Sequence, residues 1–131
     1  MSEPVLFDID STDDFDGNVE RFVKKKNFRK LPKQLEELKK DIANGIFNGT
    51  LIRKLEQPIK HEVYKLRMKN EDTNDGKSNG YRIVYAVMAD KRLVLLVTVY
   101  YKKEQTDVSD NFVDGLIEGY LLAQSDIEEE E

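Results

Sequence analysis

The chain has 131 residues, of which 39% are hydrophobic and 36% are charged, so it holds enough apolar material for one core beneath a highly charged surface. It contains no cysteine and one histidine, which excludes disulfides, thiolate catalysis and cysteine- or histidine-rich zinc sites. No run approaches the roughly 18 apolar residues that span a membrane, and the N-terminus lacks a signal-peptide pattern, so we expect a cytoplasmic protein without a membrane partner.

The formal net charge of -5 conceals a strong asymmetry along the chain. Residues 1–20 carry seven acids and no base, and residues 104–131 carry ten acids and no base. Residues 21–69 carry 15 Lys or Arg against five Asp or Glu. The middle of the chain therefore predicts a basic surface, although the pI of about 5.1 alone argues against nucleic-acid binding.

Three elements are predicted in the N-terminal third. Residues 4–10 read as a short strand. Residues 11–26 predict a helix, because a hydroxyl side chain can cap its start, its first turn is acidic and apolar residues follow at helical spacing. Residues 31–45 predict a second helix, with a proline in its first turn and an Asn-Gly stop at its end.

The rest of the chain predicts three strands and a last helix. Turn and breaker residues indicate that residues 46–60 are mostly loop. The three strands cover residues 61–69, 81–88 and 92–101. The last of them is almost wholly apolar and β-branched, which is typical of a central strand. A modest helix follows around Val113–Tyr120, and the acidic residues 126–131 predict a disordered tail.

These elements predict an α+β fold in a single domain, residues 1–125, with the order β-α-α-β-β-β-α. Consecutive strands with short connections pair antiparallel, and the two N-terminal helices are expected to cover one face of the sheet. The other face is then free to meet solvent.

A row of cations marks the first strand of this sheet. Lys65, Arg67 and Lys69 occupy alternate positions, so their side chains share one face. Like charges in a row are unfavourable unless an anion lies over them, which predicts an anion-binding face. The open alternative is a solvated strand face with no ligand.

Motifs around this row extend over one third of the chain. They are a Lys-Leu-Arg strand, a loop with Gly-Lys followed by Gly at Gly76–Gly80, a Tyr-Arg-Ile-Val-Tyr strand, and a hydrophobic strand followed by Lys-Lys-Glu. The segment from Tyr64 to Asp107 resembles the RelE/HigB toxins of type II toxin–antitoxin modules. The resemblance implies a RelE-like fold, with a small antiparallel sheet and two N-terminal helices packed on one face. It also implies a ribosome-dependent mRNA endoribonuclease that inhibits translation.

The resemblance assigns roles to nine residues by position. The implied catalytic residues are Lys65, Arg67, Arg82 and Lys102. The implied RNA-binding residues are Lys69, Lys77, Tyr81, Tyr101 and Lys103. Elementary chemistry points the same way, because repulsion among cations lowers the pKa of a lysine toward that of a useful base, and arginine clamps a phosphate through two hydrogen bonds. Lys65 then fits a base and Arg82 a transition-state clamp, and neither a metal nor another cofactor is required.

The resemblance also implies partners: the ribosome with its mRNA, and a neutralising antitoxin, expected to be a helix-turn-helix protein encoded next door. A second hypothesis remains open, in which the chain is a non-catalytic or ParE-like member of the same fold that binds protein or RNA. The cation set favours the nuclease. The absence of an aromatic residue from residues 106–109, the region where some relatives carry a tyrosine, favours the alternative.

Overall fold

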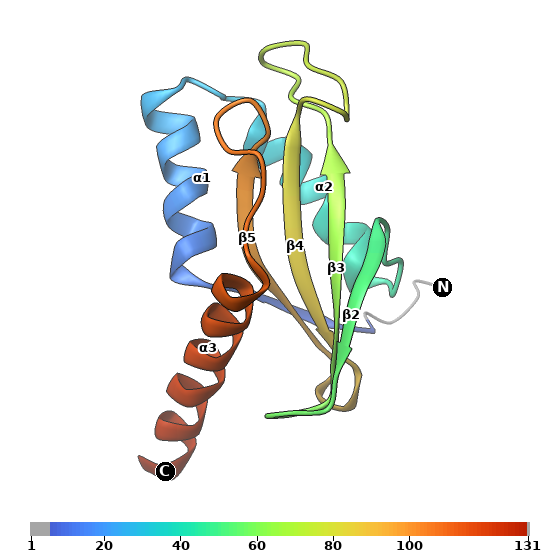
Figure 1. Ribbon diagram of the computed structural model, residues 1–131, viewed down its shortest axis with the longest axis vertical. Coiled ribbons are helices and arrows are strands. Elements are labelled where there is room, and N and C mark those ends of the chain that lie inside the picture. Colours follow the sequence, from blue (N-terminus) through green and yellow to red (C-terminus); the bar gives the residue numbers. More distant parts are fainter. Residues whose placement is uncertain (1–5, 131) are drawn as a thin grey trace, which may run out of the picture.

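The computed structural model describes the backbone of residues 6–130 and the side chains of residues 6–126. Its described part contains, in chain order, β1 (Asp8–Ser11), α1 (Asp13–Lys25), α2 (Leu31–Ala43), β2 (Thr50–Leu55), β3 (His61–Met68), β4 (Tyr81–Met88), β5 (Leu93–Tyr101) and α3 (Asp110–Glu130) (Figure 1). The predicted α+β class is confirmed. Of the predicted strand 4–10, residues 4 and 5 lie outside the described part, residues 6 and 7 are not in a strand, and β1 begins at Asp8 and extends to Ser11.

The five strands form one mixed sheet in the order β1-β5-β4-β3-β2. Strands β2 to β5 pair antiparallel, whereas β1 lies parallel to β5. The predicted all-antiparallel sheet and the order β-α-α-β-β-β-α are therefore wrong, and the observed order is β-α-α-β-β-β-β-α. The long chain between β1 and β5 permits the parallel pairing, since parallel strands need a long crossover connection.

The additional strand is β2, in the region expected to be loop. Its Asn-Gly turn signal lies just before Thr50, so it marks the start of the strand. Strand β2 is an edge strand with mostly exposed residues, and it lacks the apolar alternation by which a half-buried strand is recognised. Charged side chains are common on such edges because they discourage pairing with other chains.

Two apolar layers hold the sheet between helices. Helices α1 and α2 pack on one face, where the largest core cluster includes Phe15, Phe22, Leu31, Leu35, Ile42, Tyr81, Ile83, Tyr85, Leu96 and Tyr101. Helix α3 packs on the other face, where the cluster contains Val63, Val84, Ala86, Met88, Leu95, Val97, Val113 and Ile117. In Figure 1 α3 lies in front of the sheet and α2 behind it. Strand β4 is buried at every position, as the centre of such a sandwich must be.

Capping joins α1 to the sheet. The Thr12 hydroxyl accepts a hydrogen bond from the Phe15 main-chain N–H at 3.0 Å and donates one to the Val97 carbonyl at 2.6 Å. One side chain thus satisfies the first turn of α1 and fixes that helix against β5.

Helix α3 continues through Glu130, into residues 126–131 for which composition predicts a disordered tail; Glu131 lies outside the described part. Glutamate is a good helix former, so an acidic run can prolong a helix that is already nucleated. No helix in the described part is both long and apolar enough to cross a membrane.

Candidate functional site

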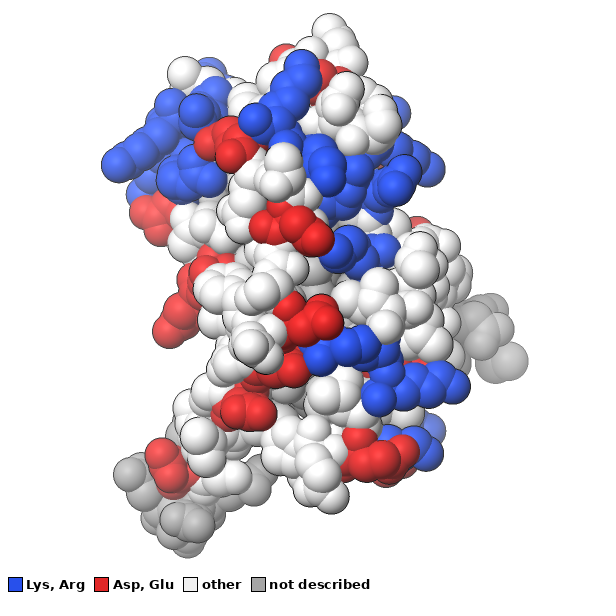
Figure 2. Space-filling model, in the orientation of Figure 1, with Lys and Arg blue, Asp and Glu red and all other residues white. Residues whose placement is uncertain are grey.

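A groove of about 760 Å³ opens on the α3 side of the sheet, beyond the part that α3 covers. Its walls come from β2, β3, β4 and β5, from the residues just before β2, and from the two loops that follow β3 and β5. The charged and aromatic residues that line it are Lys65, Arg67, Lys77, Arg82, Tyr100, Lys102 and Asp107. Five cations therefore share the groove with one carboxylate. Figure 2 shows Lys and Arg gathered over this upper part of the molecule, with Asp and Glu more frequent below it.

The sheet register brings three of these side chains into one row. Arg67 on β3 lies opposite Arg82 on β4, and Arg82 lies opposite Tyr100 on β5. Two arginines directly opposite one another are destabilising unless an anion lies between them. The pKa of Arg82 is lowered accordingly, first by burial and then by the charge of Arg67. The row of strand cations therefore continues across the sheet, and the groove is electrostatically suited to an anion.

A β-bulge in β5 determines which tyrosine reaches the groove. Val84 pairs with Thr98 while Tyr85 pairs with Leu96, which leaves Val97 as an extra residue. An extra residue reverses the alternation of side chains beyond it. Tyr100 therefore lines the groove, and Tyr101 faces the core beneath α1 and α2.

Arg82 is a buried residue, with only 5% of its surface exposed. Its guanidinium donates hydrogen bonds to the carbonyls of Lys77 at 2.7 Å and Ser78 at 2.9 Å. It therefore fastens the loop between β3 and β4 to the sheet. Most of its donors therefore serve the protein itself and are not free for a ligand.

Lys65 forms an ion pair with Asp107, with 2.8 Å between Nζ and Oδ1. Burial acts to lower the pKa of Lys65, but the hydrogen bond that it donates to Asp107 and the negative charges nearby outweigh burial, and the pKa of Lys65 is raised. The same bond, with help from the Val108 N–H, lowers the pKa of Asp107 to about 2. The predicted lowering of the Lys65 pKa is therefore wrong, because its nearest charged neighbour is an anion. Lys65 is protonated at neutral pH.

The other three cations of the groove differ in how they are engaged. Lys102 donates from Nζ to the Thr106 carbonyl at 2.7 Å. Arg67 and Lys77 are exposed, and within the described residues they form no ion pair. These two cations are the ones most available to a ligand.

Two of the predicted RNA-binding lysines lie outside the groove lining. Lys69 is exposed and lies 3.6 Å from Glu71. Lys103 forms a 2.7 Å ion pair with Asp75, which raises the pKa of the lysine and lowers that of the carboxylate to about 2. Lys103 directly follows the groove residue Lys102, whereas Lys69 lies beyond the end of β3, which stops at Met68.

Neither predicted aromatic contact is available for stacking on a base. Tyr81 is fully buried, and its ring packs edge-on against Phe22 with 5.6 Å between centroids. Tyr101 is 7% exposed, and its hydroxyl donates to Asp75. Both predicted roles are wrong, because these rings belong to the core between the sheet and the helices.

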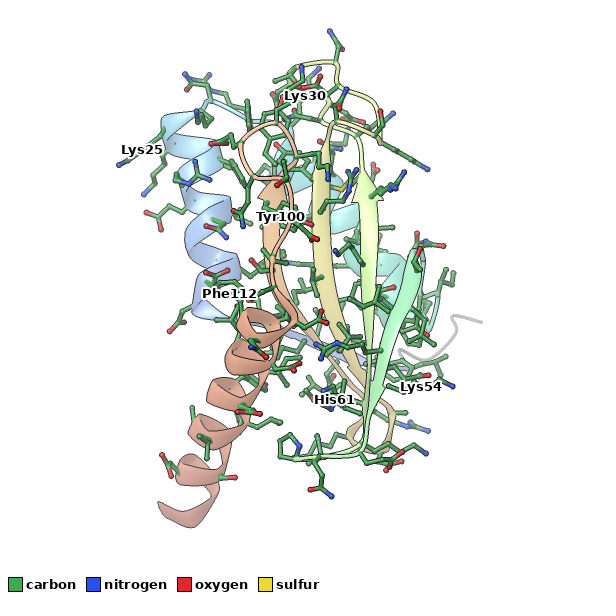
Figure 3. All side chains as sticks on the ribbon, in the orientation of Figure 1. Lys25, Lys30, Lys54, His61, Tyr100 and Phe112 are labelled. Atoms are coloured by element: carbon green, nitrogen blue, oxygen red, sulfur yellow. The ribbon has the colours of Figure 1, made fainter. Side chains whose placement is uncertain are left out.

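Among the charged and aromatic residues that line the groove, two are not among the predicted site residues, Tyr100 and Asp107. The alternation of side chains along β3 could not predict either residue, because the face on which Tyr100 lies depends on the bulge in β5 and Asp107 lies in a loop. His61, the lone histidine, lies at the opposite end of β3 from the groove, as Figure 3 shows by its separation from Tyr100. Its ring nitrogen Nδ1 is 2.7 Å from the Ile59 carbonyl oxygen.

The chain matches no known protein family, and no curated protein is significantly similar to it.

Proposed function

We propose that the chain is a toxin of the RelE/HigB type, a ribosome-dependent endoribonuclease that cleaves mRNA with Lys and Arg side chains and so inhibits translation. The observation that carries the proposal is the cross-strand pair of Arg67 and Arg82 inside a groove with three lysines. A phosphodiester relieves the repulsion between such cations, and arginine is the side chain best shaped to hold one. The groove is open to solvent, so a single RNA strand can pass through it.

The chemistry assigns roles to four groups of the groove. In cleavage at a 2′-hydroxyl, that oxygen bonds to phosphorus and the 5′-oxygen leaves with a proton, so that a 2′,3′-cyclic phosphate forms. Lys65 remains protonated and suits the proton donor to the 5′-oxygen, in place of the base expected from sequence. Arg67 and Lys77 suit the stabilisation of charge on the phosphorane, because neither forms an ion pair among the described residues.

The 2′-hydroxyl proton requires an acceptor, and Asp107 is the carboxylate that lines the groove. Its pKa of about 2 is maintained chiefly by the hydrogen bond from Lys65. When a phosphate takes the place of Asp107 on Lys65, that pKa rises toward the ordinary range for a carboxylate, and Asp107 becomes a better base.

The proposal includes the partners implied by the resemblance. An accessible groove with five cations binds nucleic acid indiscriminately, so a cell that makes the protein requires a means to cover it. We expect an antitoxin, a helix-turn-helix protein encoded next door, to do so in the cytoplasm, where the ribosomes and messages are.

A second candidate is a non-catalytic or ParE-like protein that binds RNA or protein through the same groove. This candidate is favoured because Lys65 and Tyr100 both keep their protons. The carboxylate partner of Lys65 raises the pKa of that lysine, and burial is the main cause that raises the pKa of Tyr100. Neither group is a base at neutral pH. Binding of a polyanion needs only the cations.

Primer extension on ribosome-bound message, after induction of the protein, separates the two candidates. Wild type is expected to produce cleavage products. Arg67→Ala is expected to lower the cleavage rate about a hundredfold, the usual effect of removing one transition-state clamp. Lys54→Ala is the matched control, because Lys54 is an exposed strand cation remote from the groove, and it should cleave like wild type.

Two results would change the conclusion. If wild type binds RNA and Arg67→Ala does not, yet no message is cleaved, the non-catalytic candidate replaces the nuclease. If Arg67→Ala and Lys54→Ala cleave equally well, cleavage does not take place in this groove.

A further inference from the structure

Two contacts hold the loop between β5 and α3, residues 102–109, against one wall of the groove, and a third lies within the loop. Lys65 Nζ donates to Asp107 Oδ1 at 2.8 Å, and the Tyr100 hydroxyl donates to the same oxygen at 3.3 Å. Lys102 Nζ donates to the Thr106 carbonyl at 2.7 Å. All three donors line the groove, and their acceptors are the Asp107 carboxylate and the Thr106 carbonyl.

The Asp107 carboxylate lies in the environment that a phosphate group would require. It is a single anion, and its Oδ1 atom accepts from an ammonium group, a phenol and the Val108 N–H, the last at 2.8 Å. These donors would serve equally well for a non-bridging phosphate oxygen. The side chain of Asp107 is 67% exposed, whereas that of Lys65 is 27% exposed, so the lysine is the fixed partner and the carboxylate is the displaceable one.

We propose that Asp107 occupies a second phosphate subsite, formed by Lys65, Tyr100 and Lys102, and that a bound strand must displace it. This inference rests on the proposed function, since it concerns the same groove. The first subsite contains Arg67 and Lys77, which are free of internal ion pairs among the described residues. The ligand is then a single strand of nucleic acid that places two of its phosphates in the groove.

The two subsites explain how an internal ion pair and a tight ligand can coexist. A lone phosphate at the first subsite leaves Asp107 in place. A strand held at the first subsite presents its next phosphate at a high local concentration. This phosphate therefore competes with Asp107 for the donors of the second subsite more effectively than a free anion does. When Asp107 leaves, Thr106 moves with it, and Lys102 is released as well.

The test measures binding of a fluorescent single-stranded 2′-O-methyl oligoribonucleotide, which has no free 2′-hydroxyl and stays intact. Asp107→Asn keeps the size of the side chain and removes its charge. We expect this variant to bind the oligonucleotide about fivefold more tightly, the factor that corresponds to the upper range for an exposed ion pair. Asp110→Asn is the matched control, because Asp110 undergoes the same change of charge, has a 70% exposed side chain and does not line the groove. It should change the affinity by less than about twofold.

A double-mutant cycle separates displacement from simple repulsion between Asp107 and the ligand. In the background Lys65→Met, which keeps the apolar stem of the side chain, Asp107→Asn should tighten binding by less than about twofold, because the carboxylate has no cation to compete for. An equal gain with and without Lys65 would overturn the proposal, since Asp107 would then act only as a nearby charge.

The outcome also distinguishes this inference from the proposed function. If wild type binds the oligonucleotide, Arg67→Ala weakens binding and Asp107→Asn leaves it unchanged, the second subsite is wrong while the groove remains the binding site. If neither wild type nor Asp107→Asn binds the oligonucleotide, the proposed function itself is wrong.

Discussion

Removal of the Arg82 side chain should lower the stability of the protein and also impair the groove. The guanidinium is almost fully buried and donates to the carbonyls of Lys77, Ser78 and Tyr81. Hydrogen bonds from a charged group contribute about 1.5–3 kcal/mol each. Part of this is recovered, because the freed loop carbonyls regain water and the repulsion from Arg67 disappears. We therefore expect Arg82→Ala to lose about 2–3 kcal/mol of unfolding free energy, or roughly 10 °C in melting temperature for a domain of this size.

Thermal and urea denaturation of three variants measures this effect. Arg82→Ala should show the full loss. Arg82→Lys should recover about half of it, because an ammonium group reaches the carbonyls from one atom in place of two. Arg67→Ala is the control, since Arg67 is exposed and its removal relieves repulsion, so its melting temperature should match or slightly exceed that of wild type. If Arg82→Ala melts like wild type, the side chain does not fasten the loop as described. Loss of toxicity in Arg82→Ala is informative about catalysis only at temperatures where that variant is folded.

Three further outcomes are expected from other parts of the fold. Gly80→Ala should cost more than about 2 kcal/mol in urea denaturation, because a Cβ there would overlap a main-chain oxygen of β3, whereas Gly76→Ala meets no atom within 4 Å and should be nearly neutral. Arg53→Ala should lower the free energy of unfolding by about 1–3 kcal/mol at pH 7, because the two hydrogen bonds from Arg53 to Asp114, at 2.8 and 2.5 Å, join β2 to α3. The difference from wild type should shrink at low pH, because the ion pair that lowers the pKa of Asp114 is lost when this carboxylate is protonated. Asp107→Asn should be less stable than wild type by under about 1 kcal/mol above pH 5, and the two should converge as the pH falls toward 2; a constant difference over that range would refute the ion pair.

The three central strands were predictable because their signals are local. Strand β4 has the expected bounds, 81–88, and β3 and β5 differ from expectation by one residue at one end. Apolar and β-branched runs between turn residues depend on few neighbours. Strand β2 was not predictable in this way, because an edge strand is stabilised by pairing with β3 and its own residues are polar. The parallel pairing of β1 is a tertiary event for which the sequence contains no local signal.

The site was predictable in its cations and unpredictable in its other groups. Alternation along β3 placed Lys65 and Arg67 on one face, and pairing with β4 brought Arg82 beside them. Tyr100 lines the groove in place of Tyr101 because of the bulge in β5. The residues of β5 are apolar on both faces of the sheet, so the sequence shows no alternation of polar and apolar residues from which the bulge could be recognised. The protonation of Lys65 depends on a loop that returns to the sheet, and such returns are set by tertiary contacts.

The pairing of β1 with β5 has a consequence for when, during synthesis, the groove can form. The Thr12–Val97 hydrogen bond, next to that pairing, joins residues 85 positions apart, so these contacts form only after nearly the whole chain has been synthesised. Helices α1 and α2 leave the ribosome before β4 and β5, the strands that cover their apolar faces. Folding dominated by such distant contacts is slow, on the timescale of milliseconds to seconds. The groove also draws its walls from residues as far apart as Asn48 and Asp107, so we expect affinity for polyanions to be absent from truncated nascent chains and to arise in a single late step.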